Sequence, residues 1–346
     1  AAKAAFTSVQ DKPFPDDIFT APELRWAVIG CGVIANQMAQ SFALAGRKLA
    51  GVANRTLSKA QAFAEQYGVE KVYDTVEDLY ADPNIDAVYI TTPHNTHITY
   101  LRSALAAGKH VLCEKAITLN SAELDEARAI ADEHNVVLMD ATTVLHMPLY
   151  QELRRRMDAG EFGHMNLAQL NFGSYKEYGD LTNRFYNRNL AGGAMLDIGV
   201  YALSIMRLFM ASQPVEVVSL GNTCETGVDV AGGIVCRNAD QQLGVVSLTL
   251  HSKQPKRSVI SFDKCYIEVN EYPRADHATI VWTADGHREE VHAGTEAYAL
   301  CYEMADLEKA VAGDDSKREL LDYASDVMEL MTKLRADWGV VYPEEE

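Results

Sequence analysis

Residues 25–35 read RWAVIGCGVIA. The apolar run Trp26 to Ile29 predicts a buried strand, and a glycine turn and a helical stretch follow it. Gly-x-Gly-x-x-Ala in this context is typical of a dinucleotide-binding turn. The first glycine permits the tight turn, the second lets a pyrophosphate approach the backbone, and the small third residue packs helix on strand. We therefore predict that this turn binds a cofactor through Gly30, Gly32, Val33, Ile34 and Ala35. The alternative is a strand-to-helix turn without a ligand.

Strand and helix patterns alternate over the first half of the chain. Further apolar runs lie at 49–53, 72–73, 86–91, 110–113 and 136–139. Helical stretches separate most of them, and several of these stop at a glycine. Such alternation is the signature of a parallel, doubly wound sheet. We predict an α/β fold with a Rossmann domain over residues 25–147.

The pattern changes on either side of this domain. Residues 1–24 contain Pro13, Pro15 and Pro22, so we predict an extended N-terminal arm. After residue 147, a helix over 148–160 and a strand over 165–174 are expected. Strand candidates then follow at 215–221, 232–237, 242–252, 257–262, 265–270, 278–283 and 287–292, before two helices at 297–312 and 316–336. Short connections favour antiparallel pairing, so residues 148–346 predict a second α/β domain with a mostly antiparallel sheet.

Composition limits the classes of protein that fit. A length of 346 residues suggests two domains, and 31 basic against 49 acidic side chains give a net charge of −18. This charge argues against a nucleic acid or a membrane surface as partner. No stretch approaches the roughly 18 consecutive apolar residues of a membrane span. The six cysteines form no CxxC pair and no zinc-like spacing, so we expect free thiols, no metal and a cytoplasmic location.

The residue about 20 positions beyond the fingerprint selects the nicotinamide cofactor. Here that position is Asn54, followed by Arg55. An acidic residue would bind the ribose 2′-hydroxyl and repel a 2′-phosphate, whereas a guanidinium pairs with phosphate. The sequence thus favours NADP, with NAD as the alternative. An ordinary exposed loop arginine is the competing interpretation of Arg55.

Polar residues follow two later strands of the predicted parallel sheet. Glu114 and Lys115 come directly after the strand 110–113, at the carboxyl edge where open α/β sheets bind ligands. The run 91–97 lies at the same edge, and either of its histidines could contact nicotinamide or substrate or simply cap the next helix. These two loops add Thr91, Thr92, Pro93, His94, Glu114 and Lys115 to the predicted cofactor site. A solvated loop lysine is the alternative for Lys115.

The stretch 192–201 reads GGAMLDIGVY. Its Asp197 and Tyr201 are four apart and share one face if the segment is helical. A neighbouring ammonium such as Lys115 would favour the phenolate, and the combination could move an alcohol proton while hydride passes to nicotinamide. The competing interpretation is a core tyrosine and a helix-packing carboxylate.

These motifs together resemble the Gfo/Idh/MocA oxidoreductase family over most of the chain from residue 25. The resemblance implies a Rossmann domain followed by an α/β domain whose large open sheet commonly forms a dimer interface. It also implies oxidation or reduction of sugars, inositols or related diols. Many members carry histidine where this chain has Tyr201. Tyrosine there is similar to the branch of dimeric dihydrodiol dehydrogenases and NADP-dependent D-xylose dehydrogenases.

By this resemblance, Tyr201 transfers the proton and Lys115 and Asp197 are its catalytic partners. The residues expected to contact the substrate are Lys115, Asp197, Tyr201, His97 and Arg184. Of these, His97 is expected near the nicotinamide. Two departures leave the substrate open. Ala116 replaces the family's proline after Glu-Lys, and Leu145 replaces an arginine common three residues before the proline at 148.

The leading hypothesis is an NADP-dependent oxidoreductase acting on a secondary alcohol or hemiacetal of a sugar, glycoside or cyclic polyol. A homodimer or higher oligomer through the C-terminal sheet is expected. The first alternative is a non-catalytic NAD(P)-sensing regulatory or partner-binding protein on the same fold. A tightly bound cofactor that is transiently oxidised and reduced again is a third possibility.

Overall fold

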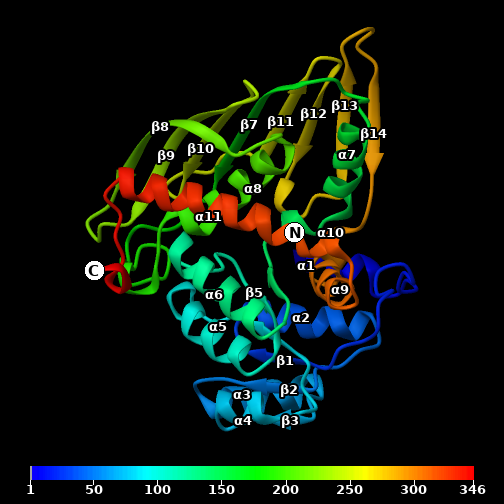
Figure 1. Ribbon diagram of the computed structural model, residues 1–346, viewed down its shortest axis with the longest axis vertical. Helices are drawn as coiled ribbons and strands as arrows, with labels where there is room; N and C mark the ends of the chain where they lie inside the picture. The colour runs from blue at the N-terminus through cyan, green and yellow to red at the C-terminus, as the bar shows by residue number, and fades with distance from the viewer. Residues whose placement is uncertain (1) are drawn as a thin grey trace. The chain divides into compact units, whose positions relative to one another are not determined.

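The computed structural model describes residues 2–346, with side chains from residue 5 onward, and they form two compact units. Unit 1 holds the chain up to Thr118 with Ala122–Ala141 and Glu296–Asp322. Unit 2 holds Leu119–Ser121, Thr142–Thr295 and Tyr323–Glu346. Figure 1 labels most of the helices and strands of both units.

Unit 1 is built on a six-stranded parallel sheet. Its strands are β1 (Trp26–Ile29), β2 (Gly51–Ala53), β3 (Lys71–Val72), β4 (Ala87–Ile90), β5 (His110–Cys113) and β6 (Leu138–Asp140). Their order is β3-β2-β1-β4-β5-β6, and every pair is parallel. Strands β1 and β4 are apolar and buried throughout, as expected where helices cover both faces. The predicted Rossmann sheet is confirmed, and its strand order reverses between β1 and β4, where such folds bind dinucleotides.

The helices of unit 1 follow the strands as the sequence predicted, with one addition. They are α2 (Val33–Leu44), α3 (Leu57–Tyr67), α4 (Val76–Ala81), α5 (His97–Ala106) and α6 (Ser121–Glu133). Helix α3 stops at Gly68, which has a φ of +66°. Helix α4 was not predicted because it is only six residues long. Its cap is Thr75, whose hydroxyl accepts a hydrogen bond from the Asp78 amide at 3.1 Å.

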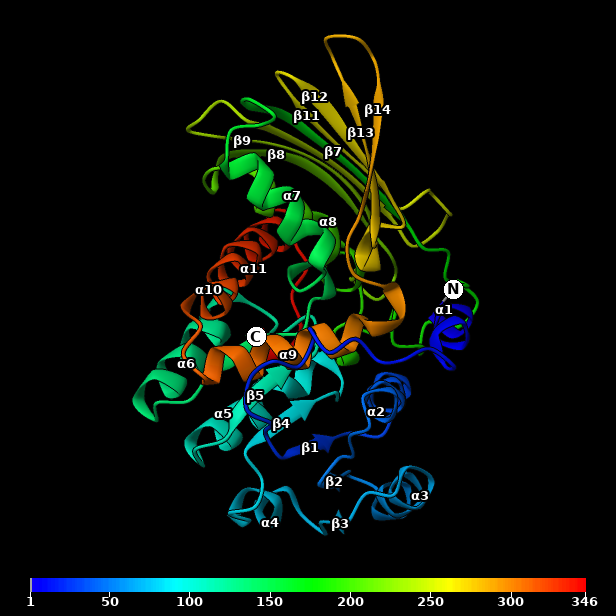
Figure 2. The same cartoon turned by 90° about the vertical axis from the view of Figure 1, so that its right-hand side faces the viewer.

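The chain returns to unit 1 late in the sequence, which corrects the predicted domain boundary. We predicted that everything after residue 147 belongs to the second domain. Helices α9 (Ala299–Val311) and α10 (Asp315–Arg318) lie in unit 1 instead. Figure 2 shows α9 beside β5. Its Leu300, Met304 and Leu307 are buried in the same core as Trp26 and Phe42, so the apolar face of α9 completes the cover of the parallel sheet.

The N-terminal arm also differs from its prediction. Residues 2–9 form helix α1 (Ala2–Val9). Three of the five residues from 2 to 6 are alanine, which has the highest helix propensity. The segment after the helix packs on its own unit. The Arg47 guanidinium lies 3.9 Å from the centre of the Phe19 ring, and Phe14 packs edge-on against Tyr298.

Unit 2 contains an eight-stranded sheet of order β14-β13-β12-β11-β7-β10-β9-β8. Its strands are β7 (Met165–Gly173), β8 (Pro214–Thr223), β9 (Asp229–Asn238), β10 (Leu243–Thr249), β11 (Arg257–Phe262), β12 (Cys265–Asn270), β13 (His277–Trp282) and β14 (Arg288–His292). Only β7 and β10 pair in parallel among the described strands of this sheet. The predicted large, mostly antiparallel sheet is therefore confirmed.

Helices cover one face of this sheet. They include α7 (Pro148–Asp158), α8 (Val200–Phe209) and α11 (Leu320–Asp337). At the end of α11, the indole of Trp338 donates to the Ser219 hydroxyl at 2.9 Å and packs over Gly221. Side chains alternate along a strand, so Val218 and Leu220 of β8 point to the opposite face. Leu220 is 83% exposed there.

One segment of unit 2 is apolar over a length that the search for consecutive apolar residues did not find. Residues Arg188–Phe209 are long and apolar enough in composition to cross a membrane. However, 78% of the most apolar window of this segment is buried inside the protein. That burial is typical of a core helix, because a spanning helix would present its apolar surface to lipid.

A buried ion pair in unit 1 generates a stability prediction. Glu308 of α9 is 1% exposed on its side chain and accepts from Arg47 at 2.8 Å and from the Trp26 indole at 3.1 Å. Glu308→Ala leaves the Arg47 charge without this partner, and we expect it to lower the free energy of unfolding by about 3–5 kcal/mol. Urea denaturation would measure the loss. The matched control, Glu65→Ala on the exposed surface of α3, should change stability by less than about 0.5 kcal/mol.

Candidate active site

The turn between β1 and α2 has the shape that the fingerprint predicts. Gly30 has a φ of +100°, and its amide donates to the Ala53 carbonyl at 2.9 Å. A Cβ at Gly30 would lie 2.5 Å from the Thr91 hydroxyl oxygen. A larger residue is therefore excluded both by the backbone conformation and by the loop after β4.

The next glycine opens this turn toward solvent. Gly32 is the N-cap of α2, and a Cβ built there meets no heavy atom within 4 Å. Ala35 is fully buried against the sheet, whereas the side chain of Val33 is 77% exposed. The first turn of a twelve-residue helix thus begins at an uncrowded backbone with small residues where the fingerprint needs them. These residues fit the pyrophosphate of a dinucleotide, which helix N-terminal N–H groups bind.

Two residues after β2 bear on which nicotinamide cofactor fits. Asn54 is half-buried, and its side-chain amide donates to the Thr56 carbonyl at 3.0 Å. Arg55 is exposed to solvent. The exposed guanidinium is available for the predicted contact with a 2′-phosphate, which stays a prediction.

The loop after β4 lies against the fingerprint turn. The Thr91 hydroxyl donates to the Ile29 carbonyl at 2.9 Å, and the Thr96 hydroxyl donates to that of Thr92 at 2.7 Å. Pro93 is exposed and His94 is half-buried. Unit 1 thereby brings the predicted cofactor residues of the β1 and β4 loops to one edge of the sheet.

His97 has a different place from the one expected. Its side chain is fully buried at the start of α5. One ring nitrogen lies 2.8 Å from the Ala116 carbonyl and 3.2 Å from the Ile117 carbonyl, and the other lies 2.8 Å from the Thr92 carbonyl. Burial lowers the pKa of His97, although these carbonyls favour the protonated ring. Because the backbone engages both nitrogens, we replace the expected substrate contact with a structural role: His97 links the β4 loop to the loop that carries Lys115.

Lys115 follows β5 as predicted. The Glu114 amide continues the sheet by donating to the Ile90 carbonyl at 3.0 Å, and the Glu114 carboxylate accepts from the Tyr89 hydroxyl at 3.4 Å. Lys115 itself is half-buried, and its peptide bond to Ala116 is cis. The lysine thus stands at the carboxyl edge of the parallel sheet, next to the backbone that His97 binds.

The Gly192–Tyr201 segment begins with a turn and a π-helix in unit 2. The π-helix spans Met195–Gly199 and runs directly into α8. Asp197 lies in the π-turn, Tyr201 lies in the first turn of α8, and both are half-buried. We had expected a plain helix through both residues. Single π-turns inside helices occur often at functional sites, and this one sets the relation between the two predicted catalytic side chains.

Close packing explains the glycines of this segment. Gly193 has a φ of +122°, and a Cβ there would lie 2.3 Å from a carboxylate oxygen of Asp229. A Cβ at Gly199 would lie 2.9 Å from the Met195 sulfur. The ring of Tyr201 stacks on Phe172 of β7, with centroids 5.7 Å apart. The turn and the tyrosine are therefore both held against neighbouring elements of unit 2.

Arg184, the other predicted substrate contact, is exposed. Its guanidinium lies 4.6 Å from the centre of the Phe185 ring. Its backbone carbonyl would be 2.7 Å from a Cβ at Gly192, so the loop around Arg184 supports the glycine turn. Sequence reasoning missed Asp229, which no local motif marks. Its carboxylate accepts from the Met195 amide at 2.6 Å and so caps the π-helix.

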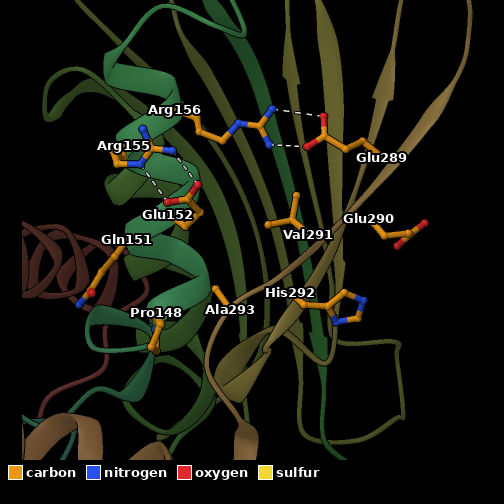
Figure 3. Close-up of a pocket in the computed structure, with 10 residues that line it drawn as sticks. All are labelled: Pro148, Gln151, Glu152, Arg155, Arg156, Glu289, Glu290, Val291, His292 and Ala293. Atoms are coloured by element: carbon orange, nitrogen blue, oxygen red, sulfur yellow. Dashed lines mark hydrogen bonds and ion pairs between the residues drawn. The ribbon is translucent and has the colours of Figure 1, made fainter. Parts of the chain in front are cut away.

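A separate cavity of about 600 Å³ lies between α7 and β14. Figure 3 shows that its two arginines are already engaged, Arg155 by Glu152 and Arg156 by Glu289. None of the predicted site residues lines this cavity. It therefore lies apart from the predicted active-site residues of unit 2.

Family models match both halves of the chain. Residues 24–142 match the model described as "Oxidoreductase family, NAD-binding Rossmann fold", and residues 150–268 match the "GFO/IDH/MocA C-terminal domain". Among curated relatives, trans-1,2-dihydrobenzene-1,2-diol dehydrogenase of Mus musculus is 32% identical over 72% of this chain and 75% of its own length. The Sus scrofa enzyme of the same name is 28% identical over 93% of this chain and 99% of its own.

Solved structures share the fold over most of the chain. A 3-ketoreductase from Actinomadura kijaniata, in complex with NADP and TDP-benzene, has a TM-score of 0.78 at 24% identity and covers 91% of this chain and 98% of its own. A levoglucosan dehydrogenase, in complex with NADH and levoglucosan, has a TM-score of 0.78 at 19% identity and covers 90% and 97%. The two matched models, the similarity to the diol dehydrogenases and the parallel sheet with its glycine turn lead to one conclusion: the chain belongs to the Gfo/Idh/MocA oxidoreductase family.

Proposed function

We propose that this oxidoreductase transfers hydride between NADP and a secondary alcohol or hemiacetal of a sugar, glycoside or cyclic diol. The observation that carries the proposal is the β1–α2 turn, where Gly30 makes room for the β4 loop and Gly32 leaves the helix N-terminus open. The substrate class is supported by the relatives, which are named for diols and sugars. The preference for NADP is supported by the exposed guanidinium of Arg55 after β2.

The chemistry is divided between the cofactor and three side chains of this protein. When bound, NADP supplies the hydride acceptor or donor. Tyr201 exchanges the proton of the substrate hydroxyl, and Lys115 stabilises negative charge on that oxygen. Asp197 orients Tyr201 from the preceding π-turn. The support for these roles is the loop geometry around Lys115 in unit 1 and the π-helix to α8 junction in unit 2.

We further propose a homodimer that pairs the uncovered faces of two unit 2 sheets. Val215, Val218 and Leu220 of β8 are 69%, 74% and 83% exposed. Val235 of β9 pairs with Val218 and extends the same apolar face. Contiguous apolar patches on a sheet mark interaction surfaces, and a second copy of the same face is complementary to it.

A reducing compartment such as the cytoplasm is supported by six unpaired cysteines, four of them buried.

Removing the proposed proton-transfer groups tests the reaction. Tyr201→Phe and Lys115→Met should each lower kcat by about 10²–10⁴-fold, because general acid–base catalysis contributes that much. The dissociation constant of NADPH, measured by its fluorescence, should change less than fivefold for Tyr201→Phe. Tyr175→Phe, at an exposed tyrosine of unit 2, is the control and should retain full turnover. Wild-type turnover in both catalytic variants would exclude this mechanism. Bound cofactor without turnover on any sugar or diol would favour a sensor.

The NADP preference depends on one side chain. Arg55→Ala should raise the dissociation constant of NADPH at least tenfold and leave that of NADH within twofold, because only the former carries a 2′-phosphate. Arg102→Ala removes another exposed arginine of unit 1 and should affect neither. Fluorescence titration of both cofactors measures the ratio. An unchanged ratio in Arg55→Ala would assign phosphate recognition elsewhere.

The dimer has its own test. The double variant Val218→Glu, Leu220→Glu should halve the molar mass measured by light scattering, because charge placed on an apolar interface is costly to bury. Leu57→Glu on α3 is the control, since it adds a charge at an exposed leucine of unit 1. The proposal fails if the double variant keeps the mass of the wild type, or if the wild type is already monomeric.

A further inference from the structure

Three residues near the end of the sequence form a hydrogen-bonded network, here called the Arg335 cluster: the buried Arg335 and Tyr342 and the half-buried Glu345. Arg335, in the last turn of α11, is 2% exposed. Its two terminal nitrogens each donate to one carboxylate oxygen of Glu345 at 2.9 Å. The guanidinium also lies 4.6 Å from the centre of the Tyr342 ring. A two-pronged arginine–carboxylate pair of this kind fixes geometry as well as charge.

One side of the cluster holds the segment Leu119–Ser121, which belongs to unit 2. Arg335 donates to the Leu119 carbonyl at 2.6 Å, and the Asn120 amide donates to Glu345 at 2.9 Å. The Ser121 amide donates to the Thr332 hydroxyl of α11 at 3.0 Å. This segment begins four residues after Lys115. The cluster therefore fixes the chain just beyond the predicted catalytic lysine.

The other side of the cluster holds the glycine turn before the π-helix. Tyr342 is fully buried, and its hydroxyl donates to the Gly192 carbonyl at 2.5 Å. The Tyr342 amide donates to Glu345 at 3.0 Å, which ties the tyrosine to the ion pair. In the adjoining loop, Arg188 donates to the Val341 carbonyl at 2.8 Å. The turn that leads to Asp197 and Tyr201 thus rests on the same network.

Asp229 completes the support on the far side of this turn. It is fully buried, it caps the π-helix through the Met195 amide, and its approach requires glycine at 193. Burial raises the pKa of Asp229 to about 6, while the Met195 amide and the charge of Arg335 oppose this rise. A buried carboxylate that loses its hydrogen-bond partners costs free energy. Conformations of the turn that move the Met195 amide away from Asp229 are therefore disfavoured.

We propose that the Arg335 cluster is a positioning device that holds the chain beyond Lys115 and the Gly192 turn in fixed register for the reaction. This inference rests on the proposed function for its catalytic consequence, but its mechanical part concerns unit 2 alone. Breaking an ion pair with a buried arginine, or its hydrogen bonds, is costly, so both segments are stiff while the cluster is intact. Stiff support of this kind is what catalysis by well-oriented groups requires.

Tyr342→Phe removes the hydroxyl that holds Gly192 and retains the buried ring. The control is Tyr150→Phe, because Tyr150 is a buried tyrosine of the same unit whose hydroxyl donates to the Tyr272 carbonyl, also at 2.5 Å. Amide hydrogen exchange, measured by mass spectrometry, should speed up at least tenfold over residues 192–201 in Tyr342→Phe and remain unchanged there in Tyr150→Phe. In Tyr342→Phe, kcat should fall about tenfold, while the dissociation constant of NADPH stays within twofold.

Glu345→Ala tests whether one network serves both segments. It removes the shared partner of Arg335, the Asn120 side-chain amide and the Tyr342 backbone amide, so exchange should speed up over residues 119–121 as well as 192–201. Unchanged exchange at 192–201 in Tyr342→Phe, or faster exchange with wild-type kcat in both variants, would overturn the proposal. If the wild type turned over no sugar or diol, the proposed function would fail. The exchange rates would still decide whether the cluster holds the two segments.

Discussion

The close approach of two backbone segments at the centre of the parallel sheet is the constraint on which the nucleotide site depends. Gly30 leaves β1 with a left-handed φ, and the Thr91 loop fills the space that any side chain at this position would take. The strand order reverses between these two strands, which opens the edge of the sheet to a ligand. The open N-cap at Gly32 lies two residues beyond Gly30 in the same turn. On the other side, His97 links the loop after β4 to the carbonyls of Ala116 and Ile117, directly after Lys115.

In unit 2, two polar side chains are partly exposed from a helical segment that is otherwise buried. Its π-turn interrupts the regular hydrogen bonding of the helix, so Asp197 and Tyr201 stand half-buried within an apolar segment. Such an irregular turn needs support, and it receives that support from Asp229 at one end and from Tyr342 at the Gly192 carbonyl. Function depends on the geometry of a site and not on the fold alone. Asp229 and Tyr342, which hold this turn, therefore matter as much as the Gly192–Tyr201 motif itself.

Most of the fold follows from local patterns, whereas the partners of each element do not. Short apolar runs predicted β1 and its neighbours, because a strand buried on both faces must be apolar. A helix was predicted at 297–312, but nothing local showed that it packs in the same core as Trp26 and Phe42 of unit 1. The spacing of Asp197 and Tyr201 suggested one helical face without revealing the π-turn. His97 was expected to contact the substrate. Its actual partners are backbone carbonyls, and such contacts leave no signal in the sequence.

Direct hydride transfer between a carbon of the substrate and NADP is the reaction proposed for this protein. Its most direct test uses a sugar or cyclic diol labelled with deuterium at the carbinol carbon and follows the label by mass spectrometry of the reduced cofactor. We expect one deuterium in each NADPH formed, together with a rise in absorbance at the reduced-nicotinamide band. Oxidised substrate accompanied by unlabelled NADPH, or no reduction of NADP by any sugar or diol, would contradict it.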